Sequence, residues 1–274
     1  MSEDCLPSAI NCTEQPHQVA LILLAHVLQK PKTWVLAHPD THLNPDQKAH
    51  LEQLVNRLQA GEPLPYLTGK QAFYGLDFAV SPAVLIPRPE TELLVEEALN
   101  WLEAHPDATH ALDVGTGSGS IAITLATRKP LLTITATDLS PEAINIAKQN
   151  AETHQVSAQI AFKQTDLVPS GNQTFSLVCA NLPYIPSHKL VEVNTLGFEP
   201  TLALDGGTDG LSLIRRLLDQ LPPKLNSPAL VLLETEATLG ADTLALAKTV
   251  FPKANVHLLQ DLARLDRLVR IEIS

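Results

Sequence analysis

The stretch Leu112-Asp113-Val114-Gly115-Thr116-Gly117-Ser118-Gly119 decides which fold this chain is expected to adopt. It opens within a short apolar run, residues 111–114, which predicts a buried strand. The apolar residues 121–127 predict a helix directly after the glycines. A glycine-rich turn between a strand and a helix lets a ligand approach the backbone closely. Its spacing is G-x-G-x-G, not the G-x-G-x-x-G of the dinucleotide fingerprint, so a tight turn without a ligand remains an alternative.

The segments after this turn alternate between strand and helix patterns. Apolar runs bounded by turn residues predict strands at residues 133–137, 158–163, 175–180 and 229–234. Helical spacing predicts helices at residues 140–150, 211–221 and 241–250, and two late strands are expected at 255–259 and 268–273. This alternation favours an α/β fold with a parallel, doubly wound sheet.

Polar residues follow several of the predicted strands. Asp138, Asp166 and Asn181 end successive strands after the glycine turn. Open α/β sheets bind ligands at the carboxyl ends of their strands, so these side chains are expected to share one crevice. A carboxylate at Asp138 can accept hydrogen bonds from both hydroxyls of a ribose. Asp166 either contacts an adenine amine or the backbone beside it, or is a solvated loop residue.

A second motif, Asn181-Leu182-Pro183-Tyr184, follows the strand predicted at residues 175–180. Pro183 lacks an N–H and restricts Leu182 to extended geometry, so the strand cannot continue. The loop then brings together an amide side chain, a backbone carbonyl and an aromatic ring. Two acceptors and a flat face are what holding a planar NH2 group requires. An ordinary strand exit is the alternative interpretation.

The first part of the chain has a different character. Residues 1–60 carry only helix-spaced apolar patterns, which predict a small helical domain. Residues 61–86 are punctuated by glycine and proline and predict a linker with a β-hairpin, made of extended pieces around residues 66–67, 73–74 and 78–80. Residues 87–274 are then expected to form the α/β domain.

Composition narrows the class of protein. The chain has 274 residues, 45% of them hydrophobic, and no apolar run long enough to span a bilayer. Its N-terminus lacks the pattern of a signal peptide. Three cysteines without metal-ligand spacing suit a reduced, cytoplasmic setting without a bound metal. The net charge of −11 argues against stable nucleic-acid binding.

Two motifs together resemble a known family. The glycine stretch is similar to the S-adenosylmethionine loop of class I methyltransferases, whose Rossmann-like sheet ends in an antiparallel strand. The Asn181 loop resembles the (Asn/Asp)-Pro-Pro-Tyr loop of methyltransferases that act on planar amines and amides. Within these, the match is to the protein-(glutamine-N5) methyltransferases of peptide chain release factors. Further matching stretches are Pro65-Tyr66-Leu67-Thr68-Gly69, Leu85-Ile86-Pro87-Arg88-Pro89-Glu90-Thr91-Glu92, Glu199-Pro200, Ala203-Leu204 and residues 205–211.

The resemblance covers residues 60–274 and extends more weakly to the helical domain. It implies an enzyme that transfers a methyl group from S-adenosylmethionine to the glutamine amide nitrogen in the Gly-Gly-Gln loop of release factors. It implies that the Asn181 oxygen and the Leu182 carbonyl accept the glutamine NH2 protons. The implied catalytic residues are Asn181, Leu182, Pro183 and Tyr184. These four, with Arg88 and Glu90, are the implied substrate contacts. The implied cofactor contacts are Gly115, Thr116, Gly117, Ser118, Gly119, Asp138, Asp166 and Asn181.

Two positions depart from the family pattern. Leu182 stands where the family usually has a first proline, yet it retains the backbone carbonyl that the chemistry uses. Arg264 stands where the family favours glycine, which predicts an altered turn. The chain is expected to act as a monomer, and its N-terminal helices, which carry no motif chemistry, are expected to dock the protein substrate.

Two other functions share part of this pattern. An amino-methyltransferase acting on a DNA adenine or an rRNA guanine uses a similar loop on a flipped base. The acidic charge and the absence of a large basic region count against it. A non-catalytic nucleotide- or NAD-binding protein would explain the glycine turn alone.

Overall fold

The computed structural model describes residues 16–193 and 197–274. The chain divides into two compact units, one ending at Lys70 and the other beginning at Gln71. None of the helices in the described ranges is long and apolar enough to cross a membrane.

The N-terminal unit is helical, as its sequence predicts. Its helices are α1 (Pro16–Leu28), α2 (Lys32–Ala37), α3 (Pro45–Gln59) and α4 (Leu64–Thr68). Asn44 caps α3 reciprocally with Gln47, and a proline follows at the first helical position. Leu23, Leu54 and Leu67 are buried in its core.

Helix α4 corrects the expectation of an extended piece at residues 66–67. Pro65 lies in its first turn, where the missing N–H costs nothing, and Gly69 ends it in a left-handed conformation. The side chain of Leu67 packs into the core of the helical unit. The helical unit therefore ends at Lys70 and includes α4.

A β-hairpin follows, made of strands β1 (Lys70–Phe73) and β2 (Leu76–Ala79). Tyr74 and Gly75 join them with φ angles of 50° and 78°, the positive values that a tight two-residue hairpin turn requires. Asn150 ties β2 to the rest of its unit, because its side chain bonds both the N–H of Ala79 at 2.8 Å and the carbonyl of Ala79 at 3.0 Å.

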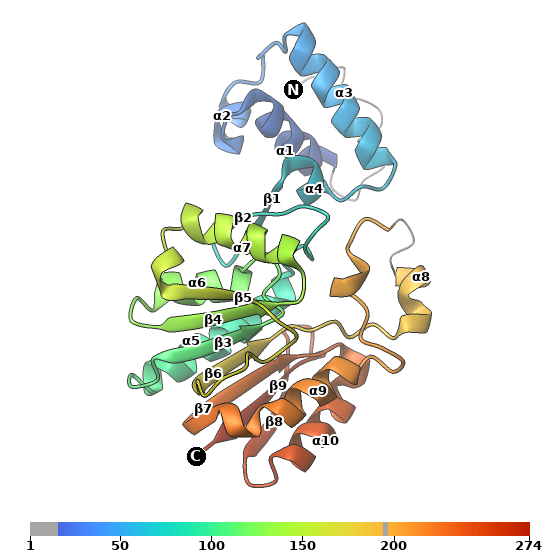
Figure 1. Cartoon of the computed structure of the whole chain (residues 1–274). Coiled ribbons are helices and arrows are strands. Elements are labelled where there is room, and N and C mark those ends of the chain that lie inside the picture. Colours follow the sequence, from blue (N-terminus) through green and yellow to red (C-terminus); the bar gives the residue numbers. More distant parts are fainter. Residues whose placement is uncertain (1–15, 194–196) are drawn as a thin grey trace. The chain divides into compact units, whose positions relative to one another are not determined.

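The second unit is built on a seven-stranded sheet in the order β5-β4-β3-β6-β7-β9-β8 (Figure 1). The strands are β3 (His110–Val114), β4 (Thr133–Asp138), β5 (Ile160–Gln164), β6 (Phe175–Ala180), β7 (Leu225–Glu234), β8 (Asn255–Gln260) and β9 (Asp266–Ile273). Strands β3 to β7 pair in parallel, whereas β9 runs antiparallel to both β7 and β8. The expected Rossmann-like methyltransferase sheet, with a late antiparallel strand, is confirmed.

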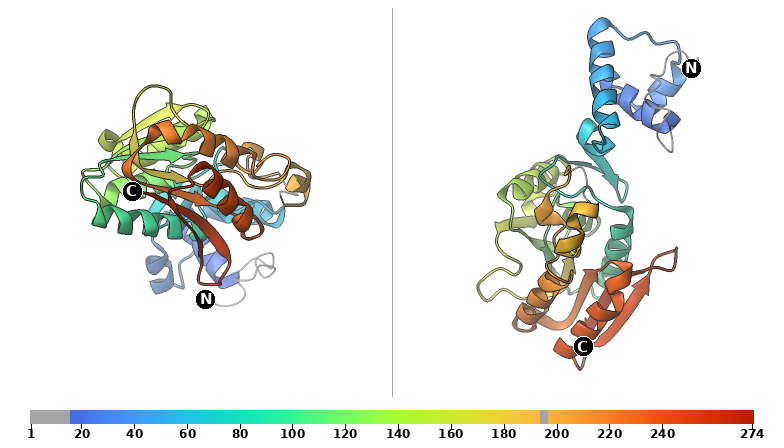
Figure 2. Two further views of the ribbon diagram at one scale, coloured as in Figure 1. Left: turned by 90° about the horizontal axis from the view of Figure 1, so that it is seen from below. Right: turned by 90° about the vertical axis from the view of Figure 1, so that its right-hand side faces the viewer.

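Helices cover both faces of this sheet. Helices α5 (Glu92–Ala104), α6 (Ser120–Arg128) and α7 (Pro141–Thr153) pack on one face. Helices α9 (Ser212–Gln220) and α10 (Gly240–Val250) pack on the other, with α10 beside β8 and β9 (Figure 2). The remaining short elements are α8 (Leu190–Val193), η3 (Pro89–Thr91), η4 (Ser157–Gln159), η5 (Ser187–Lys189), η6 (Thr201–Ala203), η7 (Pro222–Lys224) and η8 (Ala237–Leu239).

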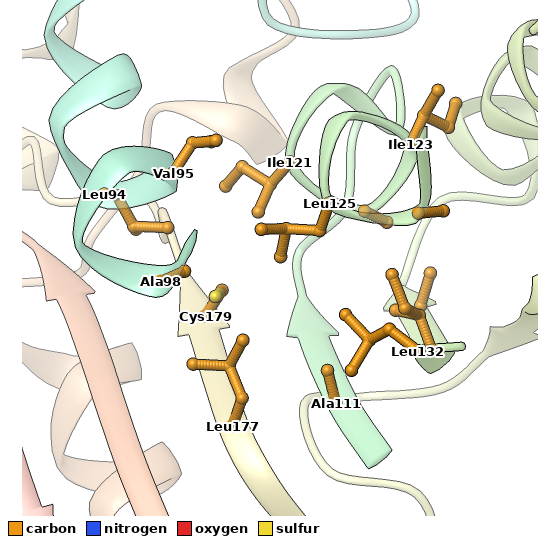
Figure 3. Close-up of a cluster of buried hydrophobic side chains, with 14 of the residues drawn as sticks. Leu94, Val95, Ala98, Ala111, Ile121, Ile123, Leu125, Leu132, Leu177 and Cys179 are labelled. Carbon is orange, nitrogen blue, oxygen red and sulfur yellow. The ribbon is translucent and has the colours of Figure 1, made fainter. Parts of the chain in front are cut away.

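Alternating side chains of the central strands enter two separate cores. Leu177 and Cys179 of β6 face the α5 side, where Ala98 lies beside them (Figure 3). Val178 and Ala180 of the same strand face the α9 side. All of β6 is buried, so its carboxyl end is held rigidly from both sides.

Candidate active site

The site lies along one edge of the sheet, where the parallel strands end. Val114 of β3 pairs with Thr137 of β4 and with Ala180 of β6, and Ala180 pairs with Leu233 of β7. The next residues along these strands are therefore neighbours at the same edge: Gly115, Asp138, Asn181 and Glu234. The sequence predicts this convergence for the first three and does not predict Glu234.

The glycine turn is shaped by positive backbone angles. Gly115, Gly117 and Gly119 have φ angles of 71°, 55° and 83°. A Cβ on Gly115 would lie 3.0 Å from the Cδ2 of Leu182, so this glycine lets the turn approach the Asn181 loop. A Cβ on Gly119 would lie 2.8 Å from the side chain of Ile123, within the helix that follows. Gly119 therefore serves helix packing.

Asp138 organises the same turn from the next strand. Its Oδ2 accepts the N–H of Gly117 at 2.9 Å, and its Oδ1 accepts the N–H of Ser140 at 2.9 Å. Burial raises the pKa of the Asp138 carboxyl, and these backbone hydrogen bonds act in the opposite direction. Each carboxylate oxygen retains a lone pair for a ligand hydroxyl.

A cavity of about 220 Å³ opens over these residues. Its floor is the turn, from Gly115 to Ser118, and Asp138 lies at its side. Ile121, Leu139 and Leu167 add apolar walls. A site with a glycine-backed floor, an acceptor for ribose hydroxyls and apolar walls for a base fits S-adenosylmethionine. Gly119 does not line it.

Asp166 lies at the rim of this cavity and forms an ion pair with Arg216 of α9. Both side chains are about half exposed, at 50% and 49%. An exposed pair of this kind contributes little to stability. Asp166 remains within reach of a ligand in the cavity, and Arg216 lines it as well.

A hydrogen bond to Thr91 anchors the side-chain amide of Asn181. Its Nδ2 donates to the hydroxyl oxygen of Thr91 at 3.0 Å. Thr91 is buried and lies just before α5. Leu182, which is 3% exposed, turns its side chain into the core beneath the glycine turn.

A second cavity, of about 450 Å³, lies on the other side of the Asn181 loop. Asn181, Leu182 and Pro183 line both cavities, whereas Tyr184 lines only the second. Burial raises the pKa of the Tyr184 hydroxyl to about 12, so the ring is neutral at physiological pH. The four-residue loop thus forms the wall between two adjoining cavities.

Arg88 also lines both cavities, and it is paired. One guanidinium nitrogen lies 2.8 Å and 2.7 Å from the two carboxylate oxygens of Glu199, and the N–H of Ile86 reaches the same carboxylate at 3.4 Å. This ion pair joins the Pro87-Arg88-Pro89 segment to Glu199-Pro200. Glu90 is exposed and lines neither cavity.

Two residues near the amide were not singled out from the sequence. Thr91 stands 90 positions before Asn181, and only the folded chain brings them together. Glu234 is 5% exposed, and burial raises its pKa to about 7. The sequence could have indicated Glu234, because it ends a predicted strand. Parallel strands on either side of β6 end at the same edge of the sheet as Asn181.

Comparison with known proteins is consistent across the chain. Residues 8–69 match the family described as PrmC N-terminal domain, and residues 90–195 match the methyltransferase small domain. A release factor glutamine methyltransferase of Bacillus anthracis is 36% identical, covering 92% of this chain and 91% of that protein. The Escherichia coli K12 protein of the same name is 38% identical, covering 83% and 82%.

Solved structures support the fold alone. A methyltransferase from Pyrococcus furiosus is 15% identical with a TM-score of 0.52, covering 84% of this chain and 98% of that one. A 16S rRNA methyltransferase from T. thermophilus is 12% identical with a TM-score of 0.53, covering 75% and 50%. The sequence identities to the Bacillus anthracis and Escherichia coli proteins, which extend over most of their length, identify the family of this chain. This chain belongs to the family of release factor glutamine methyltransferases.

Proposed function

We propose that this enzyme methylates the side-chain amide nitrogen of the glutamine in the Gly-Gly-Gln loop of peptide chain release factors. S-adenosylmethionine is its cofactor. The observation that carries the proposal is the wall between the two cavities, where Asn181 lines both the cavity over the glycine turn and the cavity beside Tyr184. A methyl group has to pass from one space to the other at this amide.

The residues that would hold the cofactor are those of the first cavity. The glycine turn from Gly115 to Ser118 would support it, Asp138 would accept hydrogen bonds from its ribose hydroxyls, and Asp166 with Arg216 would border it, since all of these line the first cavity. When bound, S-adenosylmethionine supplies an electrophilic methyl group on a positively charged sulfur.

The chemistry assigned to the Asn181 loop is positioning. An amide nitrogen is a weak nucleophile, because its lone pair is delocalised into the carbonyl. Two acceptors, the Asn181 Oδ1 and the Leu182 carbonyl, would hold the glutamine NH2 so that its lone-pair side faces the first cavity. The same acceptors favour the positive charge that develops on nitrogen during transfer. Tyr184 would pack against the glutamine side chain from the second cavity.

The N-terminal helical unit carries none of these groups, so we assign it to docking the release factor. The paired side chain of Arg88 would border the bound peptide, since it lines the second cavity. The enzyme would act in the cytoplasm as a monomer, on protein and not on nucleic acid.

Mass spectrometry of a purified release factor after incubation with enzyme and S-adenosylmethionine tests the proposal. The expected result is one added methyl group on the glutamine of the Gly-Gly-Gln loop. A release factor with that glutamine replaced by alanine is the matched control and should gain none. Methylation of DNA or rRNA, with an unmodified release factor, would overturn the assignment.

A further inference from the structure

Glu234 is a buried carboxylate that the proposed chemistry leaves unused. It is the last residue of β7 and lies beside Asn181, because Leu233 pairs with Ala180. It is 5% exposed, and its Oε2 has no hydrogen-bond partner among the described residues. It is not among the residues that line the two cavities. A buried carboxyl group with an unpaired oxygen is costly to keep.

Glu234 lies beside a hydrogen-bonded pair that includes the amide of Asn181. Both Thr91 and Asn181 favour the ionised form of the Glu234 carboxyl and so act to lower its pKa. Asn181 also donates from Nδ2 to the oxygen of Thr91 at 3.0 Å. The Thr91 hydroxyl has a single proton, and while its oxygen accepts from Asn181 that proton is available to Glu234.

An ionised carboxyl group at Glu234 fixes which neighbouring groups donate and which accept hydrogen bonds. A carboxylate only accepts, so both Thr91 and Asn181 must present hydrogens to it. The NH2 end of Asn181 is then held towards Thr91 and Glu234, and Oδ1 is left for another donor. A protonated carboxyl group also offers an O–H, which allows Asn181 to turn Oδ1 inward.

We propose that Glu234 is a positioning residue for methyl transfer, which in its ionised form holds Asn181 with Oδ1 facing the substrate amide. This rests on the proposed function of Asn181. The role explains why a charge is kept buried behind the reacting groups without touching them. Its negative charge, buried next to Asn181, also favours a positive charge developing on the substrate nitrogen.

Other charged groups face Glu234 from the neighbouring elements. Glu90, before α5, raises the pKa of Glu234, and Arg267 of β9 lowers it. Tyr184 interacts with Glu234 and also with Arg88, and it stays neutral because its own pKa is raised. Burial has the largest effect and raises the pKa of Glu234 to about 7. Activity should therefore rise with pH through about 7, as the carboxyl group loses its proton.

The test compares single-turnover methylation of a release factor by the wild type, Glu234→Gln and Glu97→Gln across about pH 5.5–9, with saturating S-adenosylmethionine. Glu97 is the matched control, because it is a partly exposed carboxylate on α5 that pairs with Arg270. The wild type and the control should gain rate through about pH 7. Glu234→Gln should be at least about tenfold slower at pH 8 and lose this rise, because a glutamine side chain does not ionise.

A purely structural role for Glu234 is separated by two further measurements. The carboxyl group has a higher pKa when folded than the usual 4.5, so the folded state binds more protons and stability falls as pH rises through this window. Glu234→Gln removes that cost and should melt no lower than the wild type at pH 8. Its affinity for S-adenosylmethionine should also be unchanged.

Variants of Thr91 test the same network from its other end. Thr91→Val removes the hydroxyl and should slow transfer, whereas Thr91→Ser keeps it and should restore most of the rate. The proposal is overturned if Glu234→Gln keeps the wild-type rate and pH profile, or if its activity falls only in step with its melting temperature. Either result leaves methylation by the wild-type enzyme, and hence the proposed function, intact.

Discussion

Asn181 lines both cavities and also bonds to the buried Thr91. Substitutions of Asn181 can distinguish a role as hydrogen-bond acceptor for the substrate from a purely structural role. Asn181→Ala removes Oδ1 and leaves a substrate N–H unpaired, which costs about 1–3 kcal/mol. Lost alignment adds to this, so methyl transfer should fall by at least about 100-fold. Asn181→Asp keeps an acceptor oxygen and should retain more activity than alanine.

Single-turnover methylation together with calorimetric titration of S-adenosylmethionine measures both effects for Asn181. Cofactor affinity should change little in either variant, because the first cavity rests mainly on the glycine turn and Asp138. Near-wild-type turnover in Asn181→Ala would rule out the acceptor role.

Asp138 is expected to determine cofactor affinity. Asp138→Ala should weaken S-adenosylmethionine binding by about 1.5–3 kcal/mol, the range for a hydrogen bond to a charged group. It also releases the N–H of Gly117, which it holds at 2.9 Å. Asp166→Ala is the matched comparison: its carboxylate is half exposed and paired with Arg216, so removing it should cost less than about 1 kcal/mol. Calorimetric titration of both variants with S-adenosylmethionine measures the two losses of affinity. Equal losses would contradict the prediction that Asp138 contributes more than Asp166.

At this scale the sequence predicts residues that belong to recognisable motifs. It predicts that Asp138 and Asn181 converge, because both follow apolar strands. It does not predict the partners of Asn181: Thr91 is brought in by the fold from 90 positions away, and Glu234 belongs to no short motif. Such partners depend on strand register, which a single sequence does not reveal.

The turn between β8 and β9 shows how an element tolerates a departure in sequence. Asp261 closes it by accepting the N–H groups of Ala263 and Leu265 at 2.8 Å and 3.0 Å. Arg264 holds a left-handed conformation there, with φ of 61°, which glycine adopts at no steric cost. Arg264 therefore adopts a left-handed conformation that a glycine would adopt without strain.

Replacing Arg264 by glycine should stabilise the protein by up to about 1 kcal/mol, since relief of left-handed strain outweighs the added freedom of the unfolded chain. Ala263→Gly is the matched control, because Ala263 is not among the residues with positive φ. It should destabilise by about 0.5–1 kcal/mol. Urea unfolding of both variants provides the comparison. A loss of stability in Arg264→Gly would show that the arginine contributes through contacts and not through backbone conformation.

Elements with long apolar runs are predicted well from the sequence, and short ones are not. Each predicted strand of the sheet is present within a few residues, because burial of one or both faces leaves a clear pattern. Helix α4 was expected to be extended, because its five residues carry too few positions to show a helical period. The segment before α9 is organised by backbone contacts, such as the N–H of Ile185 to the carbonyl of Leu204 at 3.0 Å, which leave no apolar pattern.

At the scale of the whole chain, we propose that the division after Lys70 separates docking of the protein substrate from the chemistry. Every described residue that lines either cavity lies after that division. A truncated protein that begins at Gln71 should bind S-adenosylmethionine with near-normal affinity, while its methylation of a release factor drops. Starting at residue 61 instead would leave Leu67 without its packing partners and should promote aggregation.

Calorimetry and a methylation assay on intact release factor measure the two properties of the truncated protein. A short peptide containing the Gly-Gly-Gln sequence is the control substrate, since it needs no distant docking and should lose less activity on truncation. A folded truncation that no longer binds the cofactor would show that the two units do not divide the work in this way.

The contact between Leu182 and Gly115 links the two loops in evolution. A Cβ at position 115 would lie 3.0 Å from the Cδ2 of Leu182, so a larger residue there requires the leucine side chain to move. The positive φ of Gly115 disfavours such a residue whatever stands at position 182. Selection should therefore keep glycine at position 115 more strictly than leucine at position 182.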